Sequence, residues 1–194
     1  MLICGIDEAG RGPLAGPVVA AAVVFHDNYV INGVDDSKVI SHHKREILFD
    51  KIKSECVEFI ISEVDSKEID EINILRATMK AMKNCILGLK IKPDLYLIDG
   101  NYFKLENDFQ NELNFKTIID GDATEFCISA ASILAKVDRD AKMIKYDEIY
   151  PEYLFKTHKG YGTREHIKRI MEYGLSPIHR ETFCGRYATK KMHL

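Results

Sequence analysis

The sequence lacks the features of a membrane or secreted protein. No window approaches the ~18 consecutive apolar residues that a membrane-spanning helix requires, and no basic segment with an apolar signal core precedes the first strand-like segment. The five cysteines are odd in number and none stands in C-x-x-C spacing, which argues against a disulfide framework and a zinc site. We therefore expect a cytoplasmic protein with reduced, buried thiols and no membrane partner.

The common nucleotide-binding and nucleophile motifs are also absent. No G-x-x-x-x-G-K-[ST] loop occurs, and Gly10, Gly12 and Gly16 miss the G-x-G-x-x-G spacing by one residue. No G-x-S-x-G nucleophile elbow occurs either. With 194 residues, 46% of them hydrophobic, the chain is long enough for one domain with a substantial core. These absences argue against a nucleotide cofactor and a serine nucleophile.

The net charge of −3 argues, at face value, against a nucleic-acid-binding protein. The distribution of charge changes that expectation. Residues 1–135 contain 14 Lys and Arg against 22 Asp and Glu, whereas residues 136–194 contain 13 against 8. Because the local field matters more than the net charge, an acidic body could present a metal site to a basic phosphate-binding face. The alternative is that the basic helical faces are simply solvated.

The most informative segment is Gly5–Pro17, which reads GIDEAGRGPLAGP. A short apolar strand leads to two adjacent carboxylates, Asp7 and Glu8, and then to a glycine-rich turn that contains Arg11. Carboxylate oxygens bind hard divalent cations, and glycines let N–H groups and a guanidinium approach an anionic oxygen. The segment predicts a metal site beside a phosphate-binding turn. Since neighbouring strand residues point to opposite faces, both carboxylates serve one site only if the strand ends at Glu8.

Hydrophobic periodicity predicts an α/β protein. Apolar runs predict strands at 2–6, 18–25, 56–64, 95–98 and 115–119. Spacings of three and four predict helices at 41–53, 65–89, 127–146 and 163–173, and the composition predicts a turn at 158–162 and a basic tail after residue 177.

Aspartates follow two further buried strands. Asp99 ends the strand at 95–98, and Asp120 and Asp122 follow the strand at 115–119. Sites in open α/β sheets form at such strand ends, so we expect these acids to converge with Asp7 and Glu8. Converging carboxylates repel one another, and two Mg²⁺ ions would neutralise four of them. An ordinary cap or turn remains the alternative role for each aspartate.

Five segments, in this order and across nearly the whole chain, resemble bacterial ribonuclease HII. They are GIDEAGRGPLAGP, Asp36-Ser37-Lys38, LIDGN at 97–101, SAASILAKV at 129–137 and HKGYG at 158–162. The resemblance implies a ribonuclease H-like fold, with a central mixed β-sheet flanked by helices and a small C-terminal helical part. It places the catalytic core at 1–150 and the substrate-binding part at 151–194.

The resemblance also assigns roles to individual residues. The four metal ligands and catalytic acids are Asp7, Glu8, Asp99 and Asp122, with Asp120 as a rival because the family usually has a basic residue there. The implied contacts to substrate are a ribose 2′-hydroxyl sensor at Gly10, Arg11 and Gly12, a deoxyribose contact at Tyr161, and phosphate contacts at Ser37, Lys38, His158 and Lys159. The roles of His179 and Arg180 are left open.

The implied activity is endonucleolytic cleavage of RNA in RNA–DNA hybrids, and 5′ to a single ribonucleotide in duplex DNA, leaving 3′-hydroxyl and 5′-phosphate ends. The implied cofactor is Mn²⁺ or Mg²⁺, two ions to a site, and the expected active form is a monomer. Two alternatives are another nuclease of the same fold, such as a junction resolvase, and a non-catalytic hybrid-binding protein.

Overall fold

The fold is built on one mixed five-stranded sheet with the order β3-β2-β1-β4-β5. It is seen in a computed structural model that describes residues 1–34, 40–104 and 113–188. The strands are β1 (Leu2–Ala9), β2 (Val18–His26), β3 (Glu58–Val64), β4 (Leu95–Asp99) and β5 (Phe115–Ile118). β2 pairs antiparallel with β1 and β3, whereas β4 runs parallel to β1 and β5.

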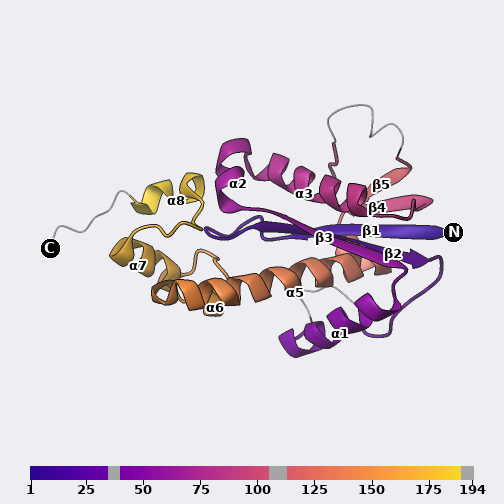
Figure 1. Cartoon of the computed structure of the whole chain (residues 1–194), viewed down its shortest axis with the longest axis horizontal. Coiled ribbons are helices and arrows are strands. Elements are labelled where there is room, and N and C mark those ends of the chain that lie inside the picture. The colour runs from indigo at the N-terminus through magenta and orange to yellow at the C-terminus, as the bar shows by residue number, and fades with distance from the viewer. Residues whose placement is uncertain (35–39, 105–112, 189–194) are drawn as a thin grey trace.

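Helices cover both faces of this sheet (Figure 1). α2 (Ser66–Ile72) and α3 (Ile74–Gly88) lie on one face, and α1 (His42–Glu55) and α5 (Phe126–Ile149) lie on the other. Strand residues alternate between the two faces, so Ala20, Ala22 and Val24 of β2 pack in one core cluster and Val19, Ala21 and Val23 in the other. The predicted fold class, a central mixed sheet flanked by helices, is confirmed.

The apolar spacing predicts one continuous helix over 65–89, and that prediction is wrong at one residue. Asn73 has φ of 68°, which ends α2 and begins α3. Its Oδ1 accepts hydrogen bonds from the backbone N–H groups of Leu75 and Arg76 at 3.0 and 3.1 Å. Asparagine tolerates the left-handed side of φ space and caps helix N-termini well. The apolar stripe therefore runs through a helix break that periodicity does not detect.

The helices that follow α5 gather at the end of the molecule away from the N-terminus (Figure 1). They are the 3₁₀ helix η2 (Pro151–Tyr153), α6 (Phe155–His158), α7 (Arg164–Tyr173) and α8 (Glu181–Ala188), and the four-residue α4 (Gly121–Thr124) precedes α5. This part packs on the core through clusters that include Leu14, Ala15 and Met143. A division between 150 and 151 stays a prediction. No helix in the described ranges is long and apolar enough to span a membrane.

The basic tail predicted after residue 177 is wrong, since α8 lies there. Its N-terminus is capped from a distance: the Asp70 carboxylate of α2 accepts from the backbone N–H groups of Glu181 and Thr182 at 2.7 and 3.1 Å. A carboxylate at a helix N-terminus satisfies unpaired N–H groups and complements the helix dipole. Because the cap is more than a hundred residues away in sequence, no local signal indicates this helix.

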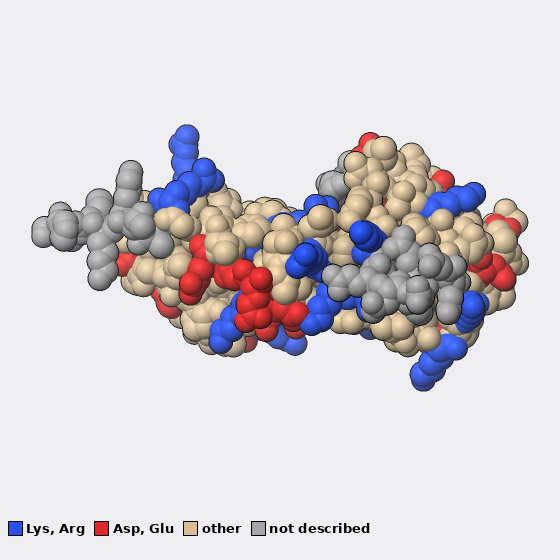
Figure 2. All heavy atoms as spheres, turned by 90° about the horizontal axis from the view of Figure 1, so that it is seen from above, with Lys and Arg blue, Asp and Glu red and all other residues tan. Residues whose placement is uncertain are grey.

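Acidic side chains gather over α2 on the face that also carries α3 (Figure 2). α2 itself contains Glu68, Asp70 and Glu71. Lysines and arginines also occur on this face (Figure 2), and Arg76, Lys80, Lys83 and Lys104 line one groove beside α3. The basic phosphate-binding face expected from residues 136–194 stays a prediction.

The closest approach of α5 to β1 requires a glycine. A Cβ at Gly5 would lie 2.0 Å from the carbonyl oxygen of Cys127, and a backbone atom at that position has no side-chain freedom with which to move away. We predict that Gly5→Ala lowers the free energy of unfolding by about 3 kcal/mol, the upper end of the usual cost of overpacking.

Gly185 of α8 is the matched control, because a Cβ there would meet nothing within 4 Å. Alanine is the better helix former, so Gly185→Ala should leave stability unchanged or raise it by about 0.5–1 kcal/mol. Urea unfolding followed by circular dichroism measures both variants. Equal effects of the two substitutions would contradict this account of the contact between α5 and β1.

Candidate active site

Two of the expected acids meet where β1 and β4 end. The parallel pairing of β1 with β4 ends at Ile6 and Ile98, and the next residue of each strand is an aspartate, Asp7 on β1 and Asp99 on β4. Asp7 is 4% exposed and faces α5, where the side chain of Ser132 forms a hydrogen bond with it. Asp99 accepts a hydrogen bond from the backbone N–H of Gly121 at 2.9 Å.

Glu8 follows Asp7 on β1, and its carboxyl group forms a hydrogen bond with that of Asp7. The strand continues to Ala9 in register with β2, so the expectation that it ends at Glu8 is wrong. The Glu8 carboxylate forms a 3.1 Å ion pair with the guanidinium of Arg11, whose side chain is half exposed. The three carboxylates lie close enough to act on one another, and the negative charge of Asp99 raises the pKa of both Asp7 and Glu8.

The crowding of these acids changes their protonation. Burial raises the pKa of Asp7 well above its usual range, and the negative charges of Glu8 and Asp99 raise it further. Burial also raises the pKa of Glu8, against the opposing effect of Arg11. A bound cation would relieve this repulsion, since a positive charge favours the ionised carboxylates.

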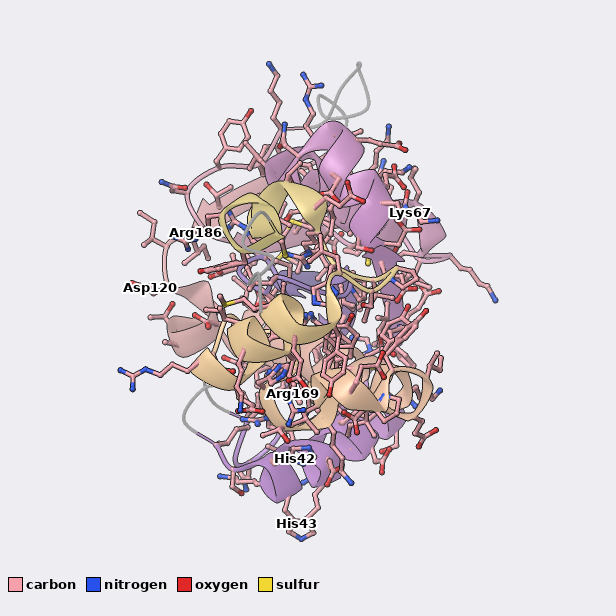
Figure 3. All side chains as sticks on the ribbon, turned by 90° about the vertical axis from the view of Figure 1, so that its left-hand side faces the viewer. His42, His43, Lys67, Asp120, Arg169 and Arg186 are labelled. Atoms are coloured by element: carbon pink, nitrogen blue, oxygen red, sulfur yellow. The ribbon has the colours of Figure 1, made fainter. Side chains whose placement is uncertain are left out.

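Asp122 and its rival Asp120 have different surroundings. Asp122 lies on α4 and is 4% exposed, and its backbone carbonyl accepts a 2.6 Å hydrogen bond from Ser129 of α5. Asp120 has a left-handed backbone with φ of 53° and is exposed, and it lies at the outer edge of the molecule in Figure 3. Gly121 lies between these two aspartates in the sequence, and its backbone N–H donates to the Asp99 carboxylate. Asp120 and Asp122 therefore flank a residue that contacts the site. This geometry favours Asp122, although its role as a ligand stays a prediction.

The chemistry of the donor set fits a hard divalent cation, which prefers carboxylate oxygens. In the described part of the chain, however, no three or more Asp, Glu, His or Cys side chains are placed so that they could hold a metal together. The ion pair between Glu8 and Arg11 accounts for part of this, because it engages one of the expected ligands.

Two buried arginines hold the glycine-rich loop that follows β1. Arg180 donates to the carbonyls of Gly10, Arg11 and Gly16 at 2.6, 2.8 and 2.8 Å. Arg139 donates to the carbonyls of Ala15 and Pro17 in the same loop at 3.1 and 3.0 Å. It also donates to the carbonyl of Lys159, in the turn before Tyr161, at 3.1 Å. Burial and the neighbouring Arg139 charge lower the pKa of the Arg180 guanidinium to about 9.

Gly10 and Gly12 meet different environments in this loop. Gly10 has φ of 94°, and a Cβ there would lie 2.0 Å from the Arg139 side chain, so only glycine fits. A Cβ at Gly12 would meet only the ring of Tyr161, whose Cε1 is 4.0 Å away. Gly12 therefore leaves an open space between the loop and the Tyr161 ring, which is 43% exposed.

The structure contradicts the phosphate contact expected of His158. That side chain is 7% exposed, its Nδ1 accepts from the backbone N–H of Gly160 at 3.2 Å, and its Nε2 donates to the carbonyl of Tyr153 at 2.8 Å. Lys159 is half-buried and remains a candidate. Ser37 and Lys38 lie outside the described residues.

The family model described as Ribonuclease HII matches residues 4–188 of this chain. The chain belongs to the ribonuclease HII family. It is 52% identical to the ribonuclease HII of Endomicrobium trichonymphae over 93% of this chain and 84% of the relative. It is 49% identical to the ribonuclease HII of Idiomarina loihiensis over 94% of this chain and 95% of the relative.

Solved structures agree with this ribonuclease HII assignment. A crystal structure of ribonuclease H2 from Pyrococcus horikoshii matches with a TM-score of 0.76 and 28% identity, covering 98% of this chain and all of that one. A structure of a PCNA:RNase HII complex from Archaeoglobus fulgidus matches with a TM-score of 0.76 and 25% identity, covering 93% and 94%. The protein is thus an endoribonuclease of ribonuclease H type 2, which acts on RNA–DNA hybrids and depends on a divalent metal.

Sequence reasoning missed several residues of this ribonuclease HII site. Ser132, which binds Asp7, and Arg139, which holds the loop, both lie on α5. Lys136 of the same helix places its ammonium 5.8 Å from the centroid of the Tyr161 ring. Their spacing in SAASILAKVDR puts them on one stretch of helix, but it does not show that this stretch faces the loop.

Three buried histidines make the fold sensitive to acid. Burial lowers the pKa of His166 from 6.5 to about 4 and that of His179 to about 3, and it also lowers the pKa of His158. In the unfolded chain such side chains bind protons below about pH 6.5. The free energy of unfolding is therefore unaffected by these histidines above about pH 6.5. It falls as the pH drops from about 6.5 toward 4, because protons then bind preferentially to the unfolded state.

We predict that His166→Asn reduces the loss of unfolding free energy between about pH 7.5 and pH 5 by about 2 kcal/mol. His43→Asn is the control: this side chain is exposed on α1, far from the C-terminal helices (Figure 3), and the substitution should leave the loss unchanged. Urea unfolding at the two pH values gives both numbers. If wild type and His166→Asn lose the same stability, the buried histidine is not the source.

Proposed function

We propose that Asp7, Glu8, Asp99 and Asp122 hold two Mg²⁺ or Mn²⁺ ions and that the protein hydrolyses the phosphodiester 5′ to a ribonucleotide. The substrates are RNA–DNA hybrids and duplex DNA with a single embedded ribonucleotide, and the products carry 3′-hydroxyl and 5′-phosphate ends. Metal ions at such a site activate water and stabilise the leaving oxygen. The observation that best supports this proposal is the position of the buried Asp7 beside Asp99 and Glu8. These acids come directly before the loop to which Arg180 is hydrogen-bonded.

The loop at Gly10, Arg11 and Gly12 is suited to reading a ribose. The carbonyls of Gly10 and Arg11 point inward to Arg180. Because a trans peptide places its N–H opposite its C=O, the N–H groups of Arg11 and Gly12 are directed away from Arg180. They are then available to a 2′-hydroxyl or a phosphate, and the 2′-hydroxyl is the group by which a protein distinguishes RNA from DNA.

Tyr161 supplies the opposite side of this space. Its ring is 43% exposed and lies next to Gly12, and it packs beside the cationic groups of Lys136 and Arg139 at 5.8 and 5.9 Å. An aromatic face supported in this way suits contact with a sugar at the RNA-to-DNA junction. Lys159, in the preceding turn, would contact phosphate.

We propose that the active form is a monomer. The ribonuclease HII of Archaeoglobus fulgidus was solved in a complex with PCNA. The cytoplasmic location favoured by the cysteine pattern stays a prediction.

Asp99→Asn should reduce cleavage of a singly ribo-substituted duplex by at least about 100-fold, because one carboxylate of the metal site is lost. Asp122→Asn should have a comparable effect, whereas Asp120→Asn should stay within about 2-fold of wild type. Cleavage mapping with and without EDTA measures all three, and a binding assay should show the duplex still bound. Intact metal-dependent cleavage in Asp99→Asn would refute the site, and a strong loss in Asp120→Asn would make that residue the ligand.

Tyr161→Ala should raise the KM for the same substrate by about 10-fold and change kcat less, since a sugar contact has been removed. Tyr102→Ala, which truncates another exposed tyrosine, is the matched control and should leave KM unchanged. An all-DNA duplex of the same sequence should remain uncut by every variant. Equal cleavage of the all-DNA and the ribo-substituted duplex by wild type would refute ribose recognition.

A further inference from the structure

Three histidines from separate segments pack together behind Tyr161. His158 ends α6, His166 lies in α7, and His179 precedes α8. The His158 and His166 rings stack with centroids 4.3 Å apart, and the His166 and His179 centroids are 5.2 Å apart. All three are at most 7% exposed.

Backbone groups determine which nitrogen of each ring carries the proton. Nδ1 of His179 accepts from the backbone N–H of Ser176 at 2.9 Å, so its proton is on Nε2. That Nε2 lies 3.0 Å from Nε2 of His166, which must therefore accept. The proton of His166 is then on Nδ1, and it donates to the carbonyl of Tyr161 at 2.9 Å.

These bonds form a chain that runs in one direction, from the N–H of Ser176 through His179 and His166 to the carbonyl of Tyr161. The backbone N–H at one end and the backbone carbonyl at the other have an invariant donor or acceptor character, and the Ser176 hydroxyl, 2.8 Å from Nδ1 of His179, can donate to the same nitrogen. The chain has no place for an extra proton, because a proton on Nε2 of His166 would face the N–H of His179. The arrangement is therefore possible only with both imidazoles neutral.

We propose that His179 and His166 are positioning residues for Tyr161: their directional hydrogen-bond chain fixes the Tyr161 carbonyl, and so the place of its ring against the substrate. The backbone N–H of Thr163 binds the same carbonyl at 2.8 Å, so the turn is held from two sides. The next residue, Arg180, holds Gly10 and Arg11. The pair His179-Arg180 thus connects both sides of the space next to Gly12.

In the described part of the chain no carboxylate acts on the His166 or His179 ring, whereas the charges of Asp147 of α5 and Glu165 of α7 favour the protonated form of His158. The charge of Lys159 acts on His158 in the opposite sense, and the rings themselves act on one another. The other packed groups are aromatic, with Phe155 5.5 and 5.6 Å from the His166 and His179 ring centroids.

The protonation pattern is directly measurable, independently of any activity. Nitrogen NMR of the wild-type protein at neutral pH should show His166 as the Nδ1–H tautomer and His158 and His179 as Nε2–H tautomers. The substitutions His43→Asn and His166→Asn each remove the signals of one histidine and so assign them. A charged His166, or its Nε2–H tautomer, would overturn the proposal.

The expected effect of the histidines on substrate binding rests on the proposed contact of Tyr161 with the substrate. A double-mutant cycle separates the role of His166 from that of Tyr161. His166→Leu should raise the KM for the singly ribo-substituted duplex by about 10-fold and leave kcat within about 2-fold. The amide of His166→Asn can still donate to the Tyr161 carbonyl, so the KM of this variant should lie close to that of wild type. In a Tyr161→Ala background, His166→Leu should add less than about 2-fold, because coupled residues are not additive.

The possible failures differ from one another. If Tyr161→Ala raises KM but His166→Leu does not, the positioning role is overturned and the proposed function stands. If His166→Leu raises KM by the same factor in the wild-type and the Tyr161→Ala backgrounds, His166 does not act through Tyr161 and the proposal is again overturned. If Tyr161→Ala leaves KM unchanged, the contact assigned to Tyr161 in the proposed function fails. Circular dichroism verifies folding, and if His166→Leu does not fold, the tautomer measurement and His166→Asn decide the question.

Discussion

The architecture of the site depends on two buried guanidinium groups whose hydrogen bonds go to backbone carbonyls. Arg139 and Arg180 are both fully buried, and in the described residues each donates to carbonyls of Gly10–Pro17 while Arg139 also reaches Lys159. Burying a charge is unfavourable unless hydrogen bonds compensate for it. The loop compensates by directing its carbonyls at the guanidinium groups, and the N–H groups of Arg11 and Gly12 are thereby directed away from Arg180.

Strand length supplies the second half of the arrangement. β1 continues to Ala9 against β2, whereas its pairing with β4 ends at Ile6 and Ile98, and Asp7, Glu8 and Asp99 come together where that pairing ends. Asp7 and Asp99 share the face that α5 covers, while Glu8 pairs with Arg11. The carboxylates and the loop that we propose to read the ribose are therefore adjacent in the sequence, with only Ala9 between them.

Local signals predicted the fold well where the determining interaction is itself local. The strands and the α5 helix follow from hydrophobic periodicity. The errors have distant or single-residue causes. Asn73 caps a helix inside an apolar stripe, Asp70 caps α8 from far away in sequence, and His158 turns inward because Tyr153 and Gly160 bind both of its nitrogens.

The sequence alone determined the family, the fold class and the candidate acids, because strand-end carboxylates and the glycine-rich segment are contiguous or strongly patterned. Tertiary structure decided what those residues face. It buried Asp122 and exposed Asp120 on either side of one glycine, and it brought Arg139 and Arg180 to a loop more than 120 positions earlier. It also joined His166 to His179. A hydrogen bond between distant residues depends on how the elements pack, and a one-dimensional pattern does not record that packing.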